Sequence, residues 1–304
     1  MKLQMLLVVI DPTKQAQPAL ERAAWLARQS GAAIELLVCE YHATLEGSSL
    51  FKPGSREKAR EHLLEQRKEW LETLAAPLRA EGLQVQTAVR WGKPLHEIVL
   101  AHADQLQPDV LLKAASDHGV LSRLFLGNSC WQLIRHCKFP LWLVHHGDFA
   151  GYKRLCAAVD PLHSVDKPAA LDHRLLSAAS QLAEQLKLDA HCLHCYAPLP
   201  RSLLFDAELI ADYPKYIEDC GKRHGEAFEQ LLSQYPQIGA KRHLLEGYPE
   251  AVIPHFVREQ SIDLLLMGAV SRSSLDSALI GNSAERVLEQ INCDLLVFHS
   301  APAP

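Results

Sequence analysis

The sequence predicts an α/β protein made of two tandem doubly wound domains, each with a five-stranded parallel sheet. Three observations support this prediction. Short apolar runs alternate with segments of helical periodicity, the runs are apolar throughout, and the same order of motifs occurs twice. Continuous apolar strands are typical of parallel sheets that are covered on both faces. Right-handed crossovers between such strands then give a doubly wound domain.

Four matched motifs indicate that the second half of the chain repeats the first. The pairs are Asp-Pro at Asp11 and Asp160, G-K-P-L-H-E-I-V from Gly92 and G-Y-P-E-A-V-I from Gly247, D-V-L-L-K-A from Asp109 and D-L-L-L-M-G from Asp263, and L-G-N-S ending at Ser129 and I-G-N-S ending at Ser283. The order is the same and the offset is nearly constant, which is the signature of a duplication. We therefore expect domains at 1–148 and 152–301, joined by a loop around 146–153.

The first half contains five apolar runs that we expect to be strands, at 4–10, 34–38, 85–89, 110–114 and 141–144. A helix from about 15 to 30 carries apolar residues at helical spacing, and Gly31 follows it as a C-terminal cap. A long helix follows near 56–80. Pro94 suits the first turn of the next helix, and a further helix begins at Asn128.

The second half repeats this pattern, with strands expected near 154–159, 190–195, 241–246, 264–268 and 295–299. The fifth strand of each half would have an exposed edge, at Leu141–Val144 and Leu295–Phe298. Such edges permit the formation of a homodimer.

Composition excludes several classes of protein. The 304 residues are 48% hydrophobic and 22% charged, with a formal net charge of −5 and no basic stripe. A general nucleic-acid or anionic-membrane binder would show such a stripe. No apolar run approaches the roughly 18 residues that a membrane span needs, and the run Met5–Ile10 is too short for a signal peptide. We expect a cytoplasmic protein without nucleic-acid or membrane partners.

The cysteines and one histidine-rich segment raise the question of a metal. Most of the eight cysteines lie in or beside apolar runs, where they act as small hydrophobic residues: Cys39, Cys137, Cys156, Cys192, Cys195 and Cys293. In the segment 191–195, strand alternation puts Cys192 and His194 on one face and His191 and Cys195 on the other. A four-ligand zinc site cannot form from this segment alone. We predict a buried strand and no metal, with zinc as the alternative.

The candidate ligand site lies at the carboxyl ends of the strands of the second half, where doubly wound sheets bind their ligands. Asp160 could accept a hydrogen bond from a ribose hydroxyl or an amino group. In the loop 268–283, Gly268 would let the backbone leave the strand at an unusual φ. Gly281 would let a phosphate approach the amides of Asn282 and Ser283 at a helix N-terminus.

Two further side chains of this loop favour a phosphate, since the Ser283 hydroxyl is a donor and Arg272 supplies a positive charge. The alternative interpretation is structural. Asp160 would then be a turn residue before Pro161, and Asn282 or Ser283 would only cap the last helix.

The loop resembles that of the universal stress protein family, whose nucleotide-binding members carry Gly-x-x-Gly, nine residues, then Gly-Ser or Gly-Thr. Here Gly268-Ala-Val-Ser271 is followed by nine residues and then Gly281-Asn282-Ser283. Ser271 replaces the second glycine, and Asn282 is inserted before Ser283. The tandem layout and the phrase S-A-L-I-G-N-S-A-E-R-V-L-E-Q-I-N-C-D-L-L-V are similar to the E-type members in particular.

The resemblance implies a stress-response role in the cytoplasm and pairing of the two repeats as an intramolecular pseudo-dimer. It also implies ATP as the ligand, contacted by Asp160, Gly268, Ser271, Gly281, Asn282 and Ser283. The first half departs from the pattern, with Ala114 and Asp117 in place of Gly268 and Ser271. The Asp117 charge would repel a phosphate, so we expect a nucleotide only in the second half.

Two other functions remain open at this stage. An apolar or lipid-like ligand could lie in a pocket between the loops at the carboxyl ends of the strands, which depart from the family pattern. Segments 42–53 and 198–210, which contain Phe51 and Phe205, would lie over it. An enzyme is disfavoured because the sequence has neither a G-x-x-x-x-G-K-[ST] loop nor a G-x-S-x-G turn. We therefore predict a non-catalytic protein.

Overall fold

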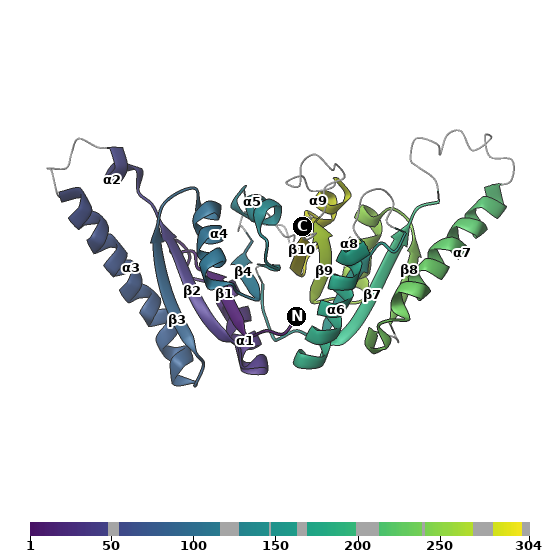
Figure 1. Cartoon of the computed structure of the whole chain (residues 1–304), viewed down its shortest axis with the longest axis horizontal. Helices are drawn as coiled ribbons and strands as arrows, with labels where there is room; N and C mark the ends of the chain where they lie inside the picture. The colour runs from purple at the N-terminus through teal and green to yellow at the C-terminus, as the bar shows by residue number, and fades with distance from the viewer. Residues whose placement is uncertain are drawn as a thin grey trace. The chain divides into compact units, whose positions relative to one another are not determined.

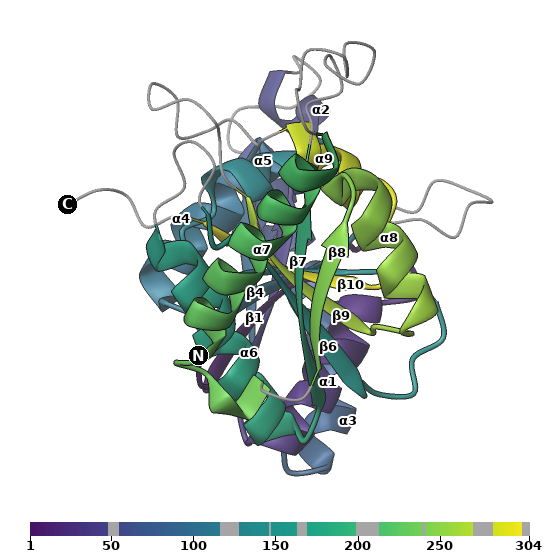
Figure 2. The same ribbon diagram turned by 90° about the vertical axis from the view of Figure 1, so that its right-hand side faces the viewer.

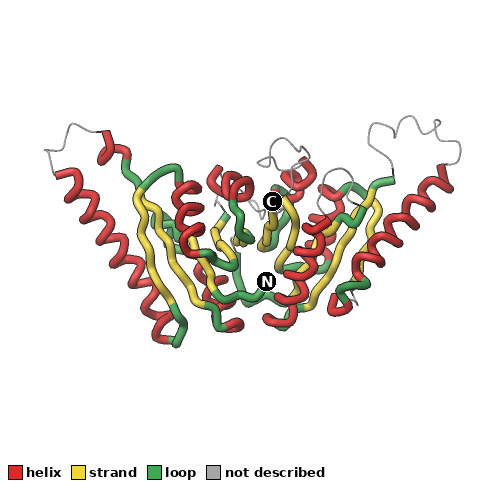
Figure 3. The backbone as a smooth tube through the Cα atoms, viewed as in Figure 1, coloured by secondary structure: helices red, strands yellow, loops and turns green. Residues whose placement is uncertain are grey.

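The computed structural model describes residues 1–47, 55–115, 128–145, 147–162, 169–198, 213–238, 241–269 and 282–299. These residues form two compact units, one within Lys2–Gly151 and the other from Tyr152 onward (Figure 1). In Figure 3 the strands of each unit, in yellow, lie among helices in red.

The first unit has five parallel strands in the order β3-β2-β1-β4-β5. Its elements are β1 (Met5–Val9), α1 (Pro18–Ser30), β2 (Ala33–Glu40), α2 (Ala43–Gly47), α3 (Ser55–Ala80), β3 (Val85–Trp91), α4 (Leu95–Leu106), β4 (Val110–Ala114), α5 (Asn128–His136) and β5 (Leu141–Val144).

The second unit repeats this topology, with strand order β8-β7-β6-β9-β10, again parallel. Its elements are β6 (Arg154–Val159), α6 (Ala169–Leu186), β7 (Asp189–Tyr196), α7 (Tyr213–Leu232), the short 3-10 helix η3 (Pro236–Ile238), β8 (Arg242–Glu246), α8 (Pro249–Glu259), β9 (Leu264–Ala269), α9 (Asn282–Leu288) and β10 (Asp294–His299). The predicted fold class and all ten predicted strands are confirmed.

Helices cover both faces of each sheet, as the continuous apolar strands require. In the first unit, Arg67 of α3 binds Glu40 and His102 of α4 binds Glu35. Positions 35 and 40 of β2 point to opposite faces because side chains alternate along a strand. Figure 2 shows the same division in the second unit, with α6 and α7 on one side of the strands and α8 on the other.

The predicted helix boundaries are close to those of the structure. Gly31 caps α1 with a left-handed φ of 75°, and its amide donates to the Ala27 carbonyl at 2.8 Å, as predicted. The prediction for Pro94 is wrong by one residue. With φ −70° and ψ 153° Pro94 is extended, so it is the N-cap residue and α4 begins at Leu95.

A matching carboxylate fixes the start of the first strand of each unit. Asp109 Oδ2 accepts the backbone N–H groups of Gln4 and Met5, each at 2.8 Å. Asp263 Oδ2 accepts those of Lys153 and Arg154, also at 2.8 Å. The repeated D-V-L-L and D-L-L-L motifs therefore have the same structural role. They hold two adjacent strands in one register.

A matching glycine ends the third strand of each unit. Gly92 has a φ of +146° and Gly247 a φ of +136°, a region that disfavours other residues. A Cβ at Gly92 would lie 2.7 Å from Ile98, and one at Gly247 would lie 2.6 Å from Val252. Both glycines are needed because the following helix packs closely against the strand end.

The role of the paired carboxylates can be tested by substitution. We expect Asp263→Ala and Asp109→Ala each to lower the free energy of unfolding by about 1–3 kcal/mol, since each leaves two backbone donors without their acceptor. Urea unfolding followed by circular dichroism measures this. Asp104→Ala is the control, because the Asp104 carboxylate pairs among the described residues only with Lys138, at an exposed position, and it should cost less than about 0.5 kcal/mol. Equal stability of all three variants would contradict the role.

Candidate functional site

The carboxyl ends of β6 and β9 form the switch point of the second unit, where the strand order reverses. The ladder between them pairs Ala157 with Leu266. Continuing this register brings Val159 level with Gly268, so Asp160 follows directly at the same edge of the sheet. The structure thus brings together two of the predicted site residues, Asp160 and Gly268.

Asp160 differs from its counterpart in the first unit. Its backbone amide donates to Asp172 Oδ2 at 3.2 Å, and within the described residues its carboxylate accepts no hydrogen bond. In the first unit, Asp11 Oδ1 accepts from the Thr13 amide at 2.9 Å and from the Thr13 hydroxyl at 2.6 Å. The Asp11 carboxylate is therefore engaged in its own turn, which leaves it fewer free acceptor sites than Asp160 has.

The reason that the sequence suggested for Gly268 is wrong. Gly268 lies inside β9, paired with Phe298, and its φ is not in the left-handed region. A Cβ at this position would overlap the side chain of Leu171 from α6, well within van der Waals distance. Close packing of a helix on the strand therefore explains this glycine. Its proposed role in ligand binding stays a prediction.

The rest of the predicted loop is only partly described. Ser271, Arg272 and Gly281 lie outside the described residues, as does Asp117 in the first half. Asn282 and Ser283 form the first turn of α9, where backbone N–H groups lack helical partners. In the first unit α5 begins at Asn128, as predicted, and β4 ends at Ala114.

Two histidines, His194 of β7 and His224 of α7, lie close to Asp160, and the sequence did not indicate that they form a pair. His194 Nδ1 donates to the Val159 carbonyl at 3.1 Å, which fixes its tautomer, and its Nε2 is 2.8 Å from His224 Nδ1. The Tyr196 ring stacks on His224 at 4.8 Å. Burial lowers the pKa of His224, and the Asp160 carboxylate acts in the opposite direction. An aromatic surface therefore lies within electrostatic range of Asp160.

Strand β7, which carries His191 and His194, has the alternation that the sequence predicts. His194 contacts Phe228 of α7, whereas His191 contacts Phe256 of α8, so the two imidazoles lie on opposite faces. Among the described residues, no group of three or more His, Cys, Asp or Glu could hold a metal ion. All eight cysteines are free, and burial raises the thiol pKa of Cys156, Cys192 and Cys293.

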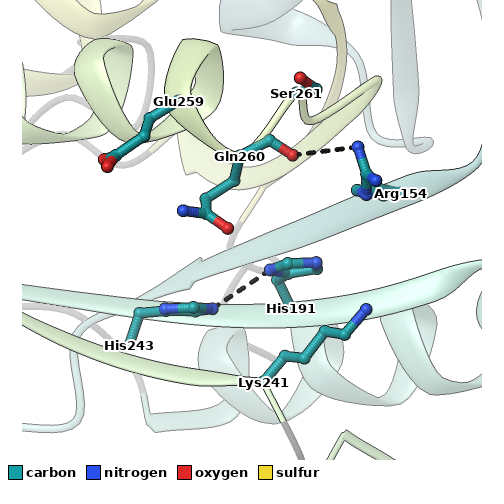
Figure 4. Close-up of a pocket in the computed structure, with 7 residues that line it drawn as sticks. All are labelled: Arg154, His191, Lys241, His243, Glu259, Gln260 and Ser261. Carbon is teal, nitrogen blue, oxygen red and sulfur yellow. Dashed lines mark hydrogen bonds between the residues drawn. The ribbon is translucent and has the colours of Figure 1, made fainter.

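A cavity of about 470 Å³ lies at the other end of the second unit, near the amino ends of its strands. Its lining residues are Arg154, His191, Lys241, His243, Glu259, Gln260 and Ser261 (Figure 4). Arg154 is the first residue of β6 whereas Asp160 follows the last, so the cavity is separate from the switch point. The sequence did not predict it, because its basic residues come from three separate strands.

Few large apolar side chains are exposed in the part of the chain that the structure describes. Tyr216, at 37%, is the one large hydrophobic residue that counts as exposed there. Of the two segments that suggested an apolar ligand, residues 48–53 and 199–210 lie outside the described residues. No helix in the described ranges is both long and apolar enough to cross a membrane.

Comparisons with known proteins agree with the architecture. The model of the universal stress protein family matches residues 3–145 and again 151–299. Universal stress protein E of Salmonella typhi is 28% identical over 295 residues, which cover 97% of this chain and 93% of that protein.

Two solved structures from Pseudomonas aeruginosa are similar over 98% of this chain at 25% identity. A functionally unknown protein from strain PAO1 has a TM-score of 0.74, and the alignment covers 93% of that protein. A universal stress protein, described as putative, from strain UCBPP-PA14 has a TM-score of 0.73 and is covered to 94%.

The packing role of Gly268 predicts a strong coupling with Leu171. Gly268→Ala should lower the free energy of unfolding by about 1–3 kcal/mol, because the new methyl group overlaps a fully packed leucine. In the Leu171→Ala background, where the methyl group has space, the same change should cost much less. Urea unfolding of the four proteins in this double-mutant cycle measures the coupling. Additive effects would contradict the packing explanation.

Proposed function

Because the chain belongs to the universal stress protein family, with one copy of the family domain in each half, we propose that it is a cytoplasmic stress-response protein that binds ATP or a related nucleotide in its second repeat. The observation that carries the proposal is the contrast between Asp160 and Asp11. Only Asp160 has a carboxylate that is free of hydrogen bonds to described residues, and it lies at the switch point of its sheet.

The start of α9 supports the placement of the phosphates. The amides of Asn282 and Ser283 are in the first helical turn, where unpaired N–H groups and the helix dipole favour an anion. The sugar and base would then extend toward Asp160, whose carboxylate can accept a hydrogen bond from a ribose hydroxyl or an amino group. Ser271, which lies outside the described residues, replaces a glycine of the family pattern.

We propose that the protein is not an enzyme, since no catalytic motif of the wider nucleotide-binding α/β class occurs in the sequence. The apolar-ligand alternative has no support among the described residues, where Tyr216 alone of the large hydrophobic side chains is exposed. The intramolecular pseudo-dimer and the homodimer stay predictions.

Binding of labelled ATP, with and without magnesium, tests the proposal. Equilibrium dialysis should show a saturable site that Gly281→Glu weakens at least about tenfold, because the new carboxylate repels the phosphates at close range. Gly127→Glu is the matched control at the equivalent position of the first repeat, and it should leave the affinity unchanged. The absence of saturable binding at millimolar ATP would refute the proposal, and displaceable lipid in the purified protein would favour the alternative.

Substitution of Asp160 and of Asp11 provides a second test with the same measurement of ATP binding. Asp160→Ala should weaken ATP binding by roughly 10–100-fold, the loss expected for a hydrogen bond to a charged acceptor. Asp11→Ala removes only the bonds to Thr13 and should leave ATP affinity unchanged. Equal effects of both substitutions would contradict the assignment to the second repeat.

A further inference from the structure

The cavity at the amino ends of the second unit's strands has the size of a small-molecule site. Its volume of about 470 Å³ falls within the range of roughly 300–1,000 Å³ that is typical of ligand pockets. The strands supply Arg154, His191 and His243, and Lys241 directly precedes β8. The end of α8 forms the opposite wall (Figure 4).

Arg154 is the cation of this cavity with the most unused hydrogen-bonding capacity. The one hydrogen bond that its side chain makes to a described residue is a long one, 3.4 Å from Nη1 to the Gln260 carbonyl, and no carboxylate pairs with the guanidinium there. A guanidinium carries five N–H donors and holds its charge at any ordinary pH. Lys241, by contrast, already pairs with Asp189 at 2.7 Å. Arg154 can therefore offer a forked pair of donors to a ligand.

The histidines provide an unsatisfied nitrogen in the wall of the cavity. His191 Nδ1 lies 3.1 Å from His243 Nε2, and the ring planes differ by 9° with centroids 5.3 Å apart. The two rings are therefore nearly parallel, and a proton on one of these two nitrogens forms the hydrogen bond between them. His191 is only 4% exposed, and its Nε2 has no hydrogen-bond partner among the described residues. A buried polar atom without a partner is costly, and the first repeat has one as well, His102 Nδ1.

The charged groups around the histidines are the cations Arg154 and Lys241 and the carboxylates Asp189 and Glu259. Burial, Lys241 and His243 lower the pKa of His191 to about 4, Arg154 acts in the same direction and Asp189 opposes them. Burial and Lys241 lower the pKa of His243 as well. From α8 comes Glu259, which is 61% exposed and lies 3.6 Å from His255. An anion beside Arg154 would counter the cations that disfavour protonated imidazoles.

The first repeat provides an internal comparison, because strand registers identify the equivalent positions. The residues equivalent to Arg154, His191, Lys241 and His243 are Met5, Glu35, Gln86 and Ala88. Glu35 there binds His102, which is equivalent to Phe256 of the second repeat. The fold forms without any of the four basic groups, so they are not a structural requirement of the repeat.

We propose that this cavity is a second ligand site, for a small molecule that bears a carboxylate or phosphate group, with Arg154 as its charged contact and the His191–His243 pair beside it. The site is independent of the nucleotide proposed at the switch point, since it lies at the opposite ends of the strands.

Titration of the full-length protein with inorganic phosphate and, separately, with succinate tests the proposal. Imidazole resonances of ¹⁵N-histidine-labelled protein report binding, and at least one anion should shift those of His191 and His243 in a saturable way. Arg154→Gln should raise the dissociation constant at least about tenfold, the loss of a charge-assisted contact. Saturation by phosphate alone or by succinate alone identifies the ligand class, and saturation by both indicates a general anion site.

Two controls keep the test specific. Arg242→Gln removes the same charge from the position of β8 between Lys241 and His243. The Arg242 side chain binds Glu229 of α7, on the face of the sheet away from the cavity, so this change should leave anion affinity unchanged. The resonances of His194 and His224 should not move with the anion, and in Arg154→Gln they show that the unit is folded. The absence of saturation with both anions would overturn the proposal, as would equal affinity in Arg154→Gln.

Discussion

The hydrogen bonds that Asp263 accepts from the amides of Lys153 and Arg154 determine how the two central strands of the second unit lie side by side. Because this register is fixed at the amino ends of β6 and β9, their carboxyl ends meet with Asp160 next to Gly268. The same two bonds hold the backbone of Arg154, which lines the cavity near the amino ends of the strands. One carboxylate therefore positions both candidate sites, although it contacts neither proposed ligand.

The duplication separates what the fold requires from what a ligand requires. Asp109 repeats the register bonds of Asp263, and Gly92 repeats the close packing of Gly247, so these features belong to the architecture. The two repeats differ at the strand ends. In the first, Asp11 is bound within its own turn, and Glu35, at the position equivalent to His191, binds the buried His102. Among the described residues, the Asp160 carboxylate and the Arg154 guanidinium of the second repeat keep unused hydrogen-bonding capacity at the two ends of the sheet, and this is why the proposed ligands are assigned to that repeat.

The sequence was sufficient to predict the strands and the duplication, because apolar runs and repeated motifs are local features of the chain. It was insufficient where a residue's role depends on a distant neighbour. The φ argument for Gly268 was wrong since the reason for this glycine is Leu171, a residue of another element. The His191–His243 pair depends on the register between β7 and β8. The alternation of residues 191–195 was predictable, but the partner of each histidine was not.

The central claim is that one repeat binds the nucleotide and the other preserves only the fold. Native mass spectrometry of the full-length protein with increasing ATP tests it most directly, since it counts ligands per chain. We expect saturation at one nucleotide per chain, with loss of that species in the Asp160→Ala protein. Saturation at two nucleotides per chain would contradict it.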